Sequence, residues 1–213
     1  VFRAIEHDAF YIYSHPQALG NAQSRFDAIV AQRNPPDPFE ARPDIGEALA
    51  AARTISGTDL DSWFGAWSAL GDRVSALAAD AAAAGHDETA RLAFWRASSY
   101  YRTAGVMLIA APLDPRLRDV THRQTDMFQR GAALMAQPPE LLKIPYEQTT
   151  LPGYFFAVDD DPRPRPTVIL TGGYDGTVEE LYFYNAAAAL ARGYNVLAFE
   201  GPGQGSVLID QGL

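Results

Sequence analysis

A short apolar run, two glycines and a long helical pattern follow one another near the C-terminal end of this sequence. The run is residues 168–170 (Val-Ile-Leu), the glycines are Gly172 and Gly173, and the helical pattern extends over residues 178–192. A second apolar segment, residues 194–199, follows the helical pattern. Strand, glycine turn, helix and strand in this order are typical of a parallel sheet with helical connections. The sequence therefore predicts an α/β fold for this region.

The glycine turn is the first candidate site. In parallel sheets, ligands bind at the carboxyl ends of the strands, which is where Gly172 and Gly173 fall. A glycine pair lets backbone N–H groups approach a reacting group closely, and glycine also tolerates a positive φ. We therefore interpret the pair as part of a site. The simpler alternative is that it only makes a tight turn.

The composition restricts the classes of partner. The chain has 213 residues, of which 17 are basic and 26 are acidic, so its formal net charge is −9. A surface this acidic argues against nucleic acid or an anionic membrane as the main partner. The absence of cysteine excludes disulfides, thiol catalysis and cysteine-ligated metals. The four histidines, His7, His15, His86 and His122, show no metal-ligand spacing. We therefore expect no metal and no cofactor.

The location of the protein is predicted from what its sequence lacks. The sequence contains no run of about 18 apolar residues that would span a membrane. Acidic residues occur within the first eight positions, where a signal peptide needs an uninterrupted apolar run. We therefore expect a cytoplasmic protein. The first residue is Val1 rather than methionine, so the start of the natural chain is left open.

Residues 1–140 have the periodicity of helices. Apolar residues recur at spacings of three and four, which predicts one buried stripe on each helix. We expect five helices, at about residues 18–32, 44–55, 58–85, 87–111 and 114–136. Thr58 and Asp61 resemble a capping box at the start of the third helix, which we expect to end at Gly85. Asp87 and Asp114 are N-cap candidates for the next two helices.

The pattern changes after Pro138 and Pro139, which we interpret as a boundary. Residues 142–149 and 154–158 are predicted to form a β-hairpin around residues 151–153 (Leu-Pro-Gly). The sequence therefore predicts two domains. The first is a helical domain at residues 1–140, and the second is the first part of an α/β domain at residues 141–213.

Large side chains form a stripe in the helical domain. One helix carries Trp63, Trp67, Leu70, Val74 and Leu77 at spacings of four and three. Trp63, Trp67 and Tyr100 are candidate binding residues for a ring-bearing substrate. The alternative, which such a pattern favours, is that these side chains form the core. Arg102 is a further candidate, because an arginine that points inward needs an acidic partner or a substrate carbonyl.

Four stretches of the sequence carry a resemblance to a known family. They are residues 96–102 (Arg-Ala-Ser-Ser-Tyr-Tyr-Arg), 144–154 (Ile-Pro-Tyr-Glu-Gln-Thr-Thr-Leu-Pro-Gly-Tyr), 170–176 (Leu-Thr-Gly-Gly-Tyr-Asp-Gly) and 199–205 (Phe-Glu-Gly-Pro-Gly-Gln-Gly). In this order they resemble the α/β-hydrolases with an amino-terminal helical cap, in the group that contains 2,6-dihydropseudooxynicotine hydrolase and the fungal yellowish-green pigment hydrolases. The resemblance implies the N-terminal portion of an α/β-hydrolase sheet, preceded by an all-α cap.

The resemblance also implies a reaction. It is the serine-dependent hydrolysis of an ester, or of a C–C bond adjacent to a carbonyl, in a small substrate. The backbone of Gly173 and Tyr174 is the expected oxyanion hole, with the N–H of Tyr174 as one donor and the N–H of the residue after the implied serine as the second. Gly172 and Asp175 are expected beside the substrate. The implied serine, acid and histidine are not visible in the sequence, and we expect them beyond residue 213.

The predicted sheet needs a further strand. Residues 194–199 are a neighbour for one edge of the strand at residues 167–170, and nothing later in the sequence pairs with its other edge. An apolar inner strand with an open edge aggregates. We therefore expect a second polypeptide, or a C-terminal portion of the same protein, to complete the sheet. A homodimer is left open.

Two other classes of function remain as alternatives. The first is a non-catalytic fragment or binding module. The second is a nucleotide-binding oxidoreductase, because residues 200–206 contain Gly-x-Gly after a strand. Ser206 stands where this motif has its third glycine, Pro202 removes an N–H that a pyrophosphate needs, and no clear amphipathic helix follows. The simplest reading of this stretch is a turn that closes the strand.

Overall fold

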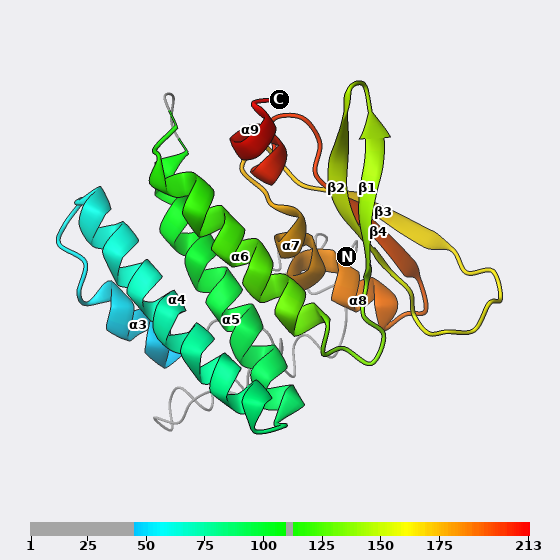
Figure 1. Cartoon of the computed structure of the whole chain (residues 1–213), viewed down its shortest axis with the longest axis horizontal. Helices are drawn as coiled ribbons and strands as arrows, with labels where there is room; N and C mark the ends of the chain where they lie inside the picture. The colour runs from blue at the N-terminus through cyan, green and yellow to red at the C-terminus, as the bar shows by residue number, and fades with distance from the viewer. Residues whose placement is uncertain (1–44, 110–112) are drawn as a thin grey trace, which may run out of the picture. The chain divides into compact units, whose positions relative to one another are not determined.

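The computed structural model describes residues 45–109 and 113–213 of the chain (Figure 1). The described residues all belong to one compact unit, residues 41–213. The helix predicted at residues 18–32 lies outside the described residues. Within the described ranges, no helix combines the length and the apolar character needed to cross a bilayer.

Helices make up the N-terminal half of the described chain. They are α3 (Ile45–Ala52), α4 (Leu60–Ala83), α5 (Asp87–Gly105) with a 3-10 turn at Val106–Leu108, and α6 (Arg116–Ala132). The helices α4, α5 and α6 lie side by side in chain order (Figure 1). The short loops between them and the apolar stripes account for this arrangement, since neighbouring helices bury their stripes against each other.

Two predicted helix caps are wrong. The N-cap of α4 is Asp59, whose carboxylate accepts from Asp61 N at 3.0 Å, so Thr58 does not cap this helix. Asp87 is the first residue of α5 and makes no side-chain cap. Asp114 does act as a cap, because its carboxylate accepts from Arg116 N at 2.9 Å at the start of α6. Gly85 lies just after α4 and has a φ of +74°, the left-handed conformation that is typical of a glycine that ends a helix. Its predicted role at the end of this helix is confirmed.

The core of the helices is tightly packed. Leu70 and Val74 are buried against α5, whereas Leu77 is half exposed and does not belong to the stripe in which it was predicted. Gly71 permits the closest approach, because a Cβ at this position would lie 2.6 Å from the ring of Tyr101. A side chain at position 71 would therefore push α4 and α5 apart.

The sheet has four strands. They are β1 (Glu140–Tyr146), β2 (Thr149–Phe156), β3 (Thr167–Thr171) and β4 (Asn195–Phe199), in the order β1-β2-β4-β3. β1, β2 and β4 pair antiparallel, and β3 pairs with β4 in parallel. The parallel pair confirms the predicted strand, turn, helix and strand. Because β3 ends the order, its second edge has no partner among the described residues.

The predicted hairpin turn is wrong. Residues 151–153 lie inside β2, opposite residues 142–144 of β1, and the turn is made by Glu147 and Gln148. Glu147 has a φ of +46°, a conformation that a non-glycine residue rarely adopts. Gly153 has a packing role instead, since a Cβ there would lie 2.8 Å from Ala198 O in β4. Pro152 and Gly153 are typical turn residues, but in this strand the glycine allows β2 to lie close to the backbone of β4.

A helical crossover connects β3 to β4. It consists of α7 (Val178–Leu181), a π-helical segment (Tyr182–Ala186) and α8 (Ala187–Leu190), which together replace the single helix predicted at residues 178–192. Thr177 is its N-cap and forms a capping box with Glu180. After β4 the chain forms a short helix, α9 (Gly205–Gln211), although no clear helix was predicted there.

Aromatic side chains join the helices to the sheet. Trp95 of α5 lies 4.9 Å from the ring of Tyr182 in the crossover, and Phe128 of α6 lies 5.2 Å from Tyr154 of β2, measured between ring centroids. Trp95 and Phe128 are fully buried, and the indole N–H of Trp95 donates to Phe128 O at 3.2 Å. The helical and α/β parts therefore share a core, and the division into two domains at residue 140 stays a prediction.

Candidate active site

The glycine turn lies where the sequence predicts, at the carboxyl end of β3. Thr171 of β3 pairs with Phe199 of β4, so the loops after the two parallel strands leave the sheet at the same edge. One loop holds Gly172 and Gly173, and the other holds Gln204. Two stretches far apart in the sequence are thereby brought into direct contact.

The side chain of Gln204 makes this contact. Its Nε2 donates to Gly172 O at 2.7 Å and to Gly173 O at 3.1 Å. Its Oε1 accepts from Gly201 N at 2.8 Å and from the hydroxyl of Thr171 at 3.3 Å. Sequence reasoning did not single out Gln204, because a glutamine in a glycine-rich loop has no signature of its own.

Two backbone donors of the turn are unused. Within the described part of the chain, neither the N–H of Gly173 nor that of Tyr174 has a hydrogen-bond acceptor. The turn is closed on its other side by Gly176 N, which donates to Gly173 O at 3.2 Å. The ring of Tyr174 is 78% exposed, so it packs under no helix among the described residues. Adjacent unpaired N–H groups at the end of a strand are what an oxyanion hole needs.

The structure agrees with one of the two expected reasons for the glycine pair, open access to a backbone N–H group, and not with the other, a positive φ. Neither Gly172 nor Gly173 has a positive φ, and a Cβ at Gly173 would meet no atom within 4 Å. The close approach is at Gly176, where a Cβ would lie 3.2 Å from Gly173 N. Gly173 therefore keeps space open above its N–H group, and Gly176 lets the turn close.

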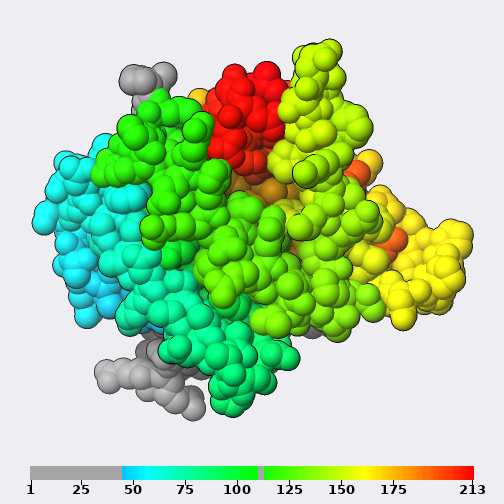
Figure 2. All heavy atoms as spheres, viewed as in Figure 1, coloured from blue at the N-terminus to red at the C-terminus, as the bar shows by residue number. Residues whose placement is uncertain are grey.

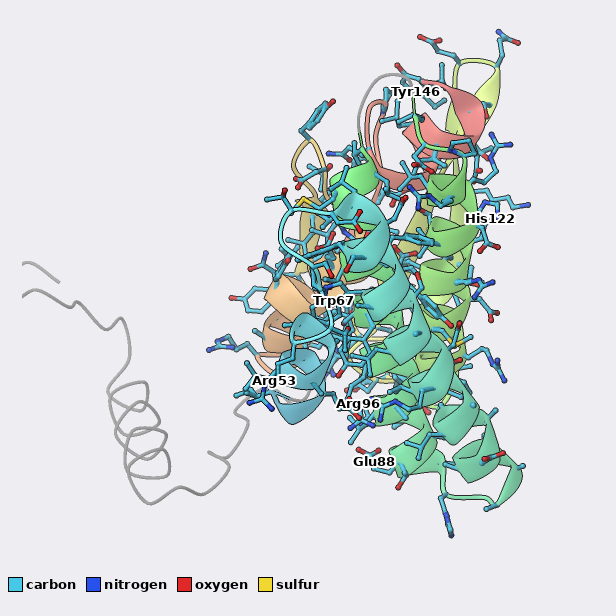
Figure 3. The ribbon with its side chains drawn as sticks, turned by 90° about the vertical axis from the view of Figure 1, so that its left-hand side faces the viewer. Arg53, Trp67, Glu88, Arg96, His122 and Tyr146 are labelled. Carbon is cyan, nitrogen blue, oxygen red and sulfur yellow. The ribbon has the colours of Figure 1, made fainter. Side chains whose placement is uncertain are left out.

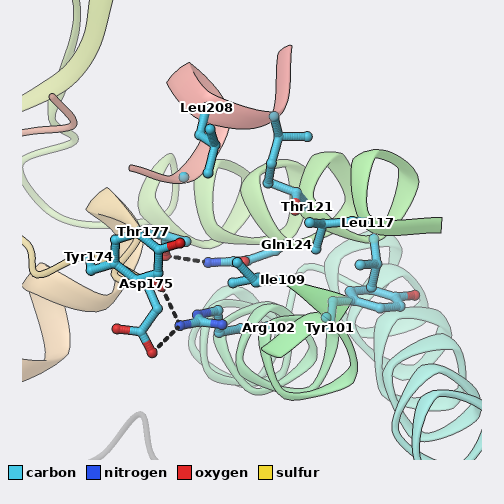
Figure 4. Close-up of a pocket in the computed structure, with 14 residues that line it drawn as sticks. Tyr101, Arg102, Ile109, Leu117, Thr121, Gln124, Tyr174, Asp175, Thr177 and Leu208 are labelled. Atoms are coloured by element: carbon cyan, nitrogen blue, oxygen red, sulfur yellow. Dashed lines mark hydrogen bonds and ion pairs between the residues drawn. The ribbon is translucent and has the colours of Figure 1, made fainter. Parts of the chain in front are cut away.

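Arg102 attaches the cap helix α5 to the turn (Figure 4). Its Nε donates to Glu180 at 2.8 Å and its Nη2 to Asp175 O at 2.6 Å, with the Asp175 carboxylate at 3.9 Å. The side chain is 13% exposed, so the inward-pointing arginine has the acidic partner that was expected. Glu180 also accepts from Thr177 N at 3.0 Å in the capping box of α7. Arg102 thus contacts both the turn and the helix that follows it.

The three aromatic candidates of the cap lie together, but away from this turn. Trp63 lies 5.8 Å from Trp67, and Trp67 lies 5.9 Å from Tyr100, between ring centroids. Trp67 and Tyr100 are buried in the core between α3, α4 and α5 (Figure 3). The indole N–H of Trp63 donates to Thr103 O at 2.8 Å. None of the three lines the pocket at Tyr174. Of the predicted site residues, those that lie together at the turn in the described part of the chain are Gly172, Gly173, Tyr174, Asp175 and Arg102.

The space next to the turn is small. A cavity of about 20 Å³ lies between the cap helices and the turn, lined among others by Tyr101, Arg102, Gln124, Tyr174 and Leu208 (Figure 4). This volume holds about one water molecule. A larger recess of about 460 Å³ opens between α6, α9 and the β1–β2 hairpin, with α7 at its floor (Figure 2). The cavity at the turn is therefore too small for a molecule much larger than water.

Comparisons with known proteins agree with this architecture. No family model matches the sequence. Over 172 residues the chain is 39% identical to 20-hydroxy-prefusarin hydrolase FUS2 of Gibberella moniliformis, covering 79% of this chain and 41% of that protein. It is 40% identical over 170 residues to hydrolase LUC6 of a Fusarium species, covering 76% of this chain and 40% of that protein. The chain thus spans about two fifths of the length of these curated relatives.

A solved structure decides the fold. The crystal structure of 2,6-dihydroxy-pseudo-oxynicotine hydrolase superimposes with a TM-score of 0.66 at 25% sequence identity, covering 80% of this chain and 46% of that one. This chain has the α/β-hydrolase fold. The two relatives named above are fungal hydrolases, in agreement with the resemblance that was based on the four stretches of sequence. In this hydrolase fold the turn after β3 and the loop after β4 meet at the candidate site.

A buried carboxylate lies at the base of the candidate site. Glu200, at the end of β4, is 3% exposed and accepts from Val178 N at 3.0 Å and from Ser206 N at 2.8 Å. The hydroxyl of Ser206 donates to the same carboxylate at 2.7 Å. Glu200 therefore holds the starts of α7 and α9 together. The hydroxyl of Ser206 is occupied by this hydrogen bond, which argues against Ser206 as a nucleophile.

This carboxylate also argues against the oxidoreductase alternative. A dinucleotide loop offers the N–H groups at a helix N-terminus to a pyrophosphate. Here the N–H of Ser206 at the start of α9 is taken by Glu200, and the N–H of Gly201 is taken by Gln204. Gly203 N donates to Leu213 O at 2.7 Å. The negative charge and these three occupied donors argue against a phosphate in this loop.

A second buried carboxylate links the sheet to the cap. Glu179 of α7 is 3% exposed and accepts from Thr125 of α6 at 2.9 Å and from Tyr154 of β2 at 3.2 Å. Burial, followed by the nearby charge of Glu200, raises the pKa of Glu179 to about 7. Burial also raises the pKa of Tyr154. Within the described residues, no group of three or more histidine, aspartate or glutamate side chains could hold a metal ion.

Proposed function

We propose that this chain supplies the helical cap and the oxyanion turn of a serine-dependent α/β-hydrolase. The observation that carries the proposal is the pair of unpaired N–H groups at Gly173 and Tyr174, next to the parallel strands. Hydrolysis of a carbonyl substrate develops negative charge on the carbonyl oxygen, and backbone N–H donors at about 3 Å stabilise it. Losing one such donor costs roughly 3–4 kcal/mol of barrier.

The nucleophile belongs to polypeptide beyond residue 213 in this proposal. The open edge of β3 supports it, because Ile169 on this strand is 66% exposed and the edge has no partner among the described residues. A strand added there would end beside the oxyanion turn. The covered length also supports it, since the match reaches only about two fifths of the relatives' length. A second polypeptide or a C-terminal portion of the same protein would supply the serine, acid and histidine.

The proposed substrate is a small molecule, with a ring in its structure, that contains an ester or a C–C bond adjacent to a carbonyl. The names of one relative, 20-hydroxy-prefusarin hydrolase, and of the matching solved structure, 2,6-dihydroxy-pseudo-oxynicotine hydrolase, each state a particular small molecule. The position of the helices beside the turn supports a role in selecting the substrate here. The arginine contact from α5 to Asp175 gives the cap a direct influence on the turn. A cytoplasmic location remains a prediction.

A serine-reactive fluorophosphonate tests the proposal. The longer protein that contains this segment should react stoichiometrically, at a serine beyond residue 213. The 213-residue chain alone should not react, because its Ser206 is held by Glu200. Labelling of Ser206 would overturn the assignment. Absence of labelling in both proteins would favour the alternative of a non-catalytic binding module.

A further inference from the structure

Gln204 uses its whole side-chain amide to bridge two loops. The two hydrogens of Nε2 are donated to successive carbonyls, Gly172 O at 2.7 Å and Gly173 O at 3.1 Å. The oxygen Oε1 accepts from Gly201 N at 2.8 Å, in the loop of Gln204 itself. An amide held at both ends has a fixed orientation, and therefore fixes the two carbonyls that it binds.

The direction of a backbone N–H follows from the carbonyl in the same peptide group. In a trans peptide, the C=O and the N–H point in opposite directions. The carbonyl of Gly172 shares a peptide group with the N–H of Gly173, and the carbonyl of Gly173 shares one with the N–H of Tyr174. Because both carbonyls point to Gln204, both N–H groups point away from it, to the same side of the turn.

The turn has few other restraints. Glycine has the widest range of backbone conformations, so the peptide groups next to Gly172 and Gly173 rotate easily when nothing holds them. Within the described residues, these carbonyls have one further restraint apart from Gln204, the bond from Gly176 N to Gly173 O at 3.2 Å. The carbonyl of Gly172 depends on Gln204 alone in this part of the chain.

We propose that Gln204 is a positioning residue that sets the direction of the oxyanion donors. It contacts neither substrate nor nucleophile, and acts by holding the Gly173 and Tyr174 N–H groups in place before the substrate binds. Donors that are already oriented need no reorganisation when charge develops, which makes them effective in the transition state. The catalytic consequence of this inference rests on the proposed function, whereas its structural part does not.

The test is the substitution Gln204→Glu in the longer, active protein. Glutamate has the shape of glutamine and keeps an acceptor for Gly201 N, but it loses both donors and places negative charge against two carbonyls. The matched control is Gln211→Glu, at the other end of α9. Gln211 also donates to a backbone carbonyl, Thr150 O at 3.1 Å, and accepts from the hydroxyl of Thr149 at 2.8 Å. The two variants have the same change of charge and the same type of lost bond.

Two probes report on the oxyanion hole. The first is hydrolysis of p-nitrophenyl butyrate, and the second is inhibition by phenyl trifluoromethyl ketone, whose adduct with a serine carries an oxyanion. In Gln204→Glu we expect kcat to fall by about a hundredfold and the inhibition constant to rise by a similar factor. KM should change by less than about threefold, and Gln211→Glu should stay within about threefold of the parent in all three constants. Equal losses in the two variants, or a kcat of Gln204→Glu within threefold of the parent, would overturn the inference.

A crystal structure of Gln204→Glu separates this inference from the proposed function. We expect the peptide group between Gly172 and Gly173 to be rotated, so that the N–H of Gly173 no longer points away from residue 204, because the carbonyl of Gly172 has no other partner among the described residues. An unchanged peptide orientation would overturn the inference whatever the kinetics are. If the parent neither hydrolyses the ester nor binds the ketone, the proposed function fails, and the rotated or unrotated peptide still decides the role of Gln204.

Discussion

At the scale of single residues, the loop after β4 depends on Gly205. A Cβ at this position would lie 2.0 Å from Oε1 of the buried Glu200, and the φ of Gly205 is +37°. The carboxylate is held by Val178 N and by Ser206, so it has no room to move away. The loop therefore tolerates neither the volume nor the conformation of a side chain here.

We predict that Gly205→Ala destabilises the protein by about 2–4 kcal/mol, because it combines a steric clash with an unfavourable φ. Urea denaturation measures the free energy of unfolding. The control is Gly201→Ala in the same loop, where a Cβ would lie 3.7 Å from the Gln204 side chain and φ is not positive. We expect the control to change stability by less than about 1 kcal/mol. If Gly205→Ala cost no more stability than Gly201→Ala, the Glu200 carboxylate would be able to move away from the added methyl group.

At the scale of the secondary-structure elements, Trp67 packs in the core of the helices. The sequence left open whether Trp67 lines a pocket or packs in the core. In the structure it is 9% exposed and lies against Trp63 and Tyr100. Spacings of three and four predict a buried face, but they do not say what the face is buried against.

We predict that Trp67→Ala costs about 3–5 kcal/mol of stability, because it leaves a large cavity between α4 and α5. The control on the same helix is Leu77→Ala, since Leu77 is 50% exposed and its loss should cost less than about 1 kcal/mol. Thermal or urea unfolding of both variants measures the difference. If Trp67→Ala cost no more than the control, the packing of the cap around this tryptophan would be contradicted.

The sequence predicted the elements better than the contacts between them. Periodicity located α4, α5, α6 and the parallel pair of strands, since these signals are local. The hairpin turn was misplaced because Pro152 and Gly153 are turn-formers in sequence, whereas Gly153 is needed for contact with Ala198. The turn at Gly173 was also located, but Gln204 and Glu179 were missed. Their roles depend on partners 31 and 54 residues away, and a single sequence contains no signal for such pairs.

At the scale of the whole described unit, Glu179 connects three parts of the molecule. It lies on α7, and its carboxylate accepts from Thr125 on α6 and from Tyr154 on β2. The groups that face it also include Gln124 and the second buried acid, Glu200. Its pKa of about 7 lies above the ordinary value of 4.5, because burial disfavours the charged form.

The raised pKa predicts how stability depends on pH. Between the two pKa values the folded protein holds a proton on Glu179 that the unfolded chain has released. The contribution to stability is therefore complete below about pH 4.5 and is lost as the pH rises through about 7. We expect the free energy of unfolding to fall over this window, with a slope of at most about 1.4 kcal/mol per pH unit.

Glu179→Gln should remove most of this slope, because glutamine stays neutral at every pH and resembles the protonated acid. Urea denaturation across pH 5 to 8 compares the parent, Glu179→Gln and the exposed control Glu140→Gln. The control should keep the slope of the parent. A slope that persists in Glu179→Gln would contradict the assignment of the pH dependence to this carboxyl group. Loss of the slope would show that the buried carboxyl of Glu179 is the group whose bound proton stabilises the folded protein at low pH.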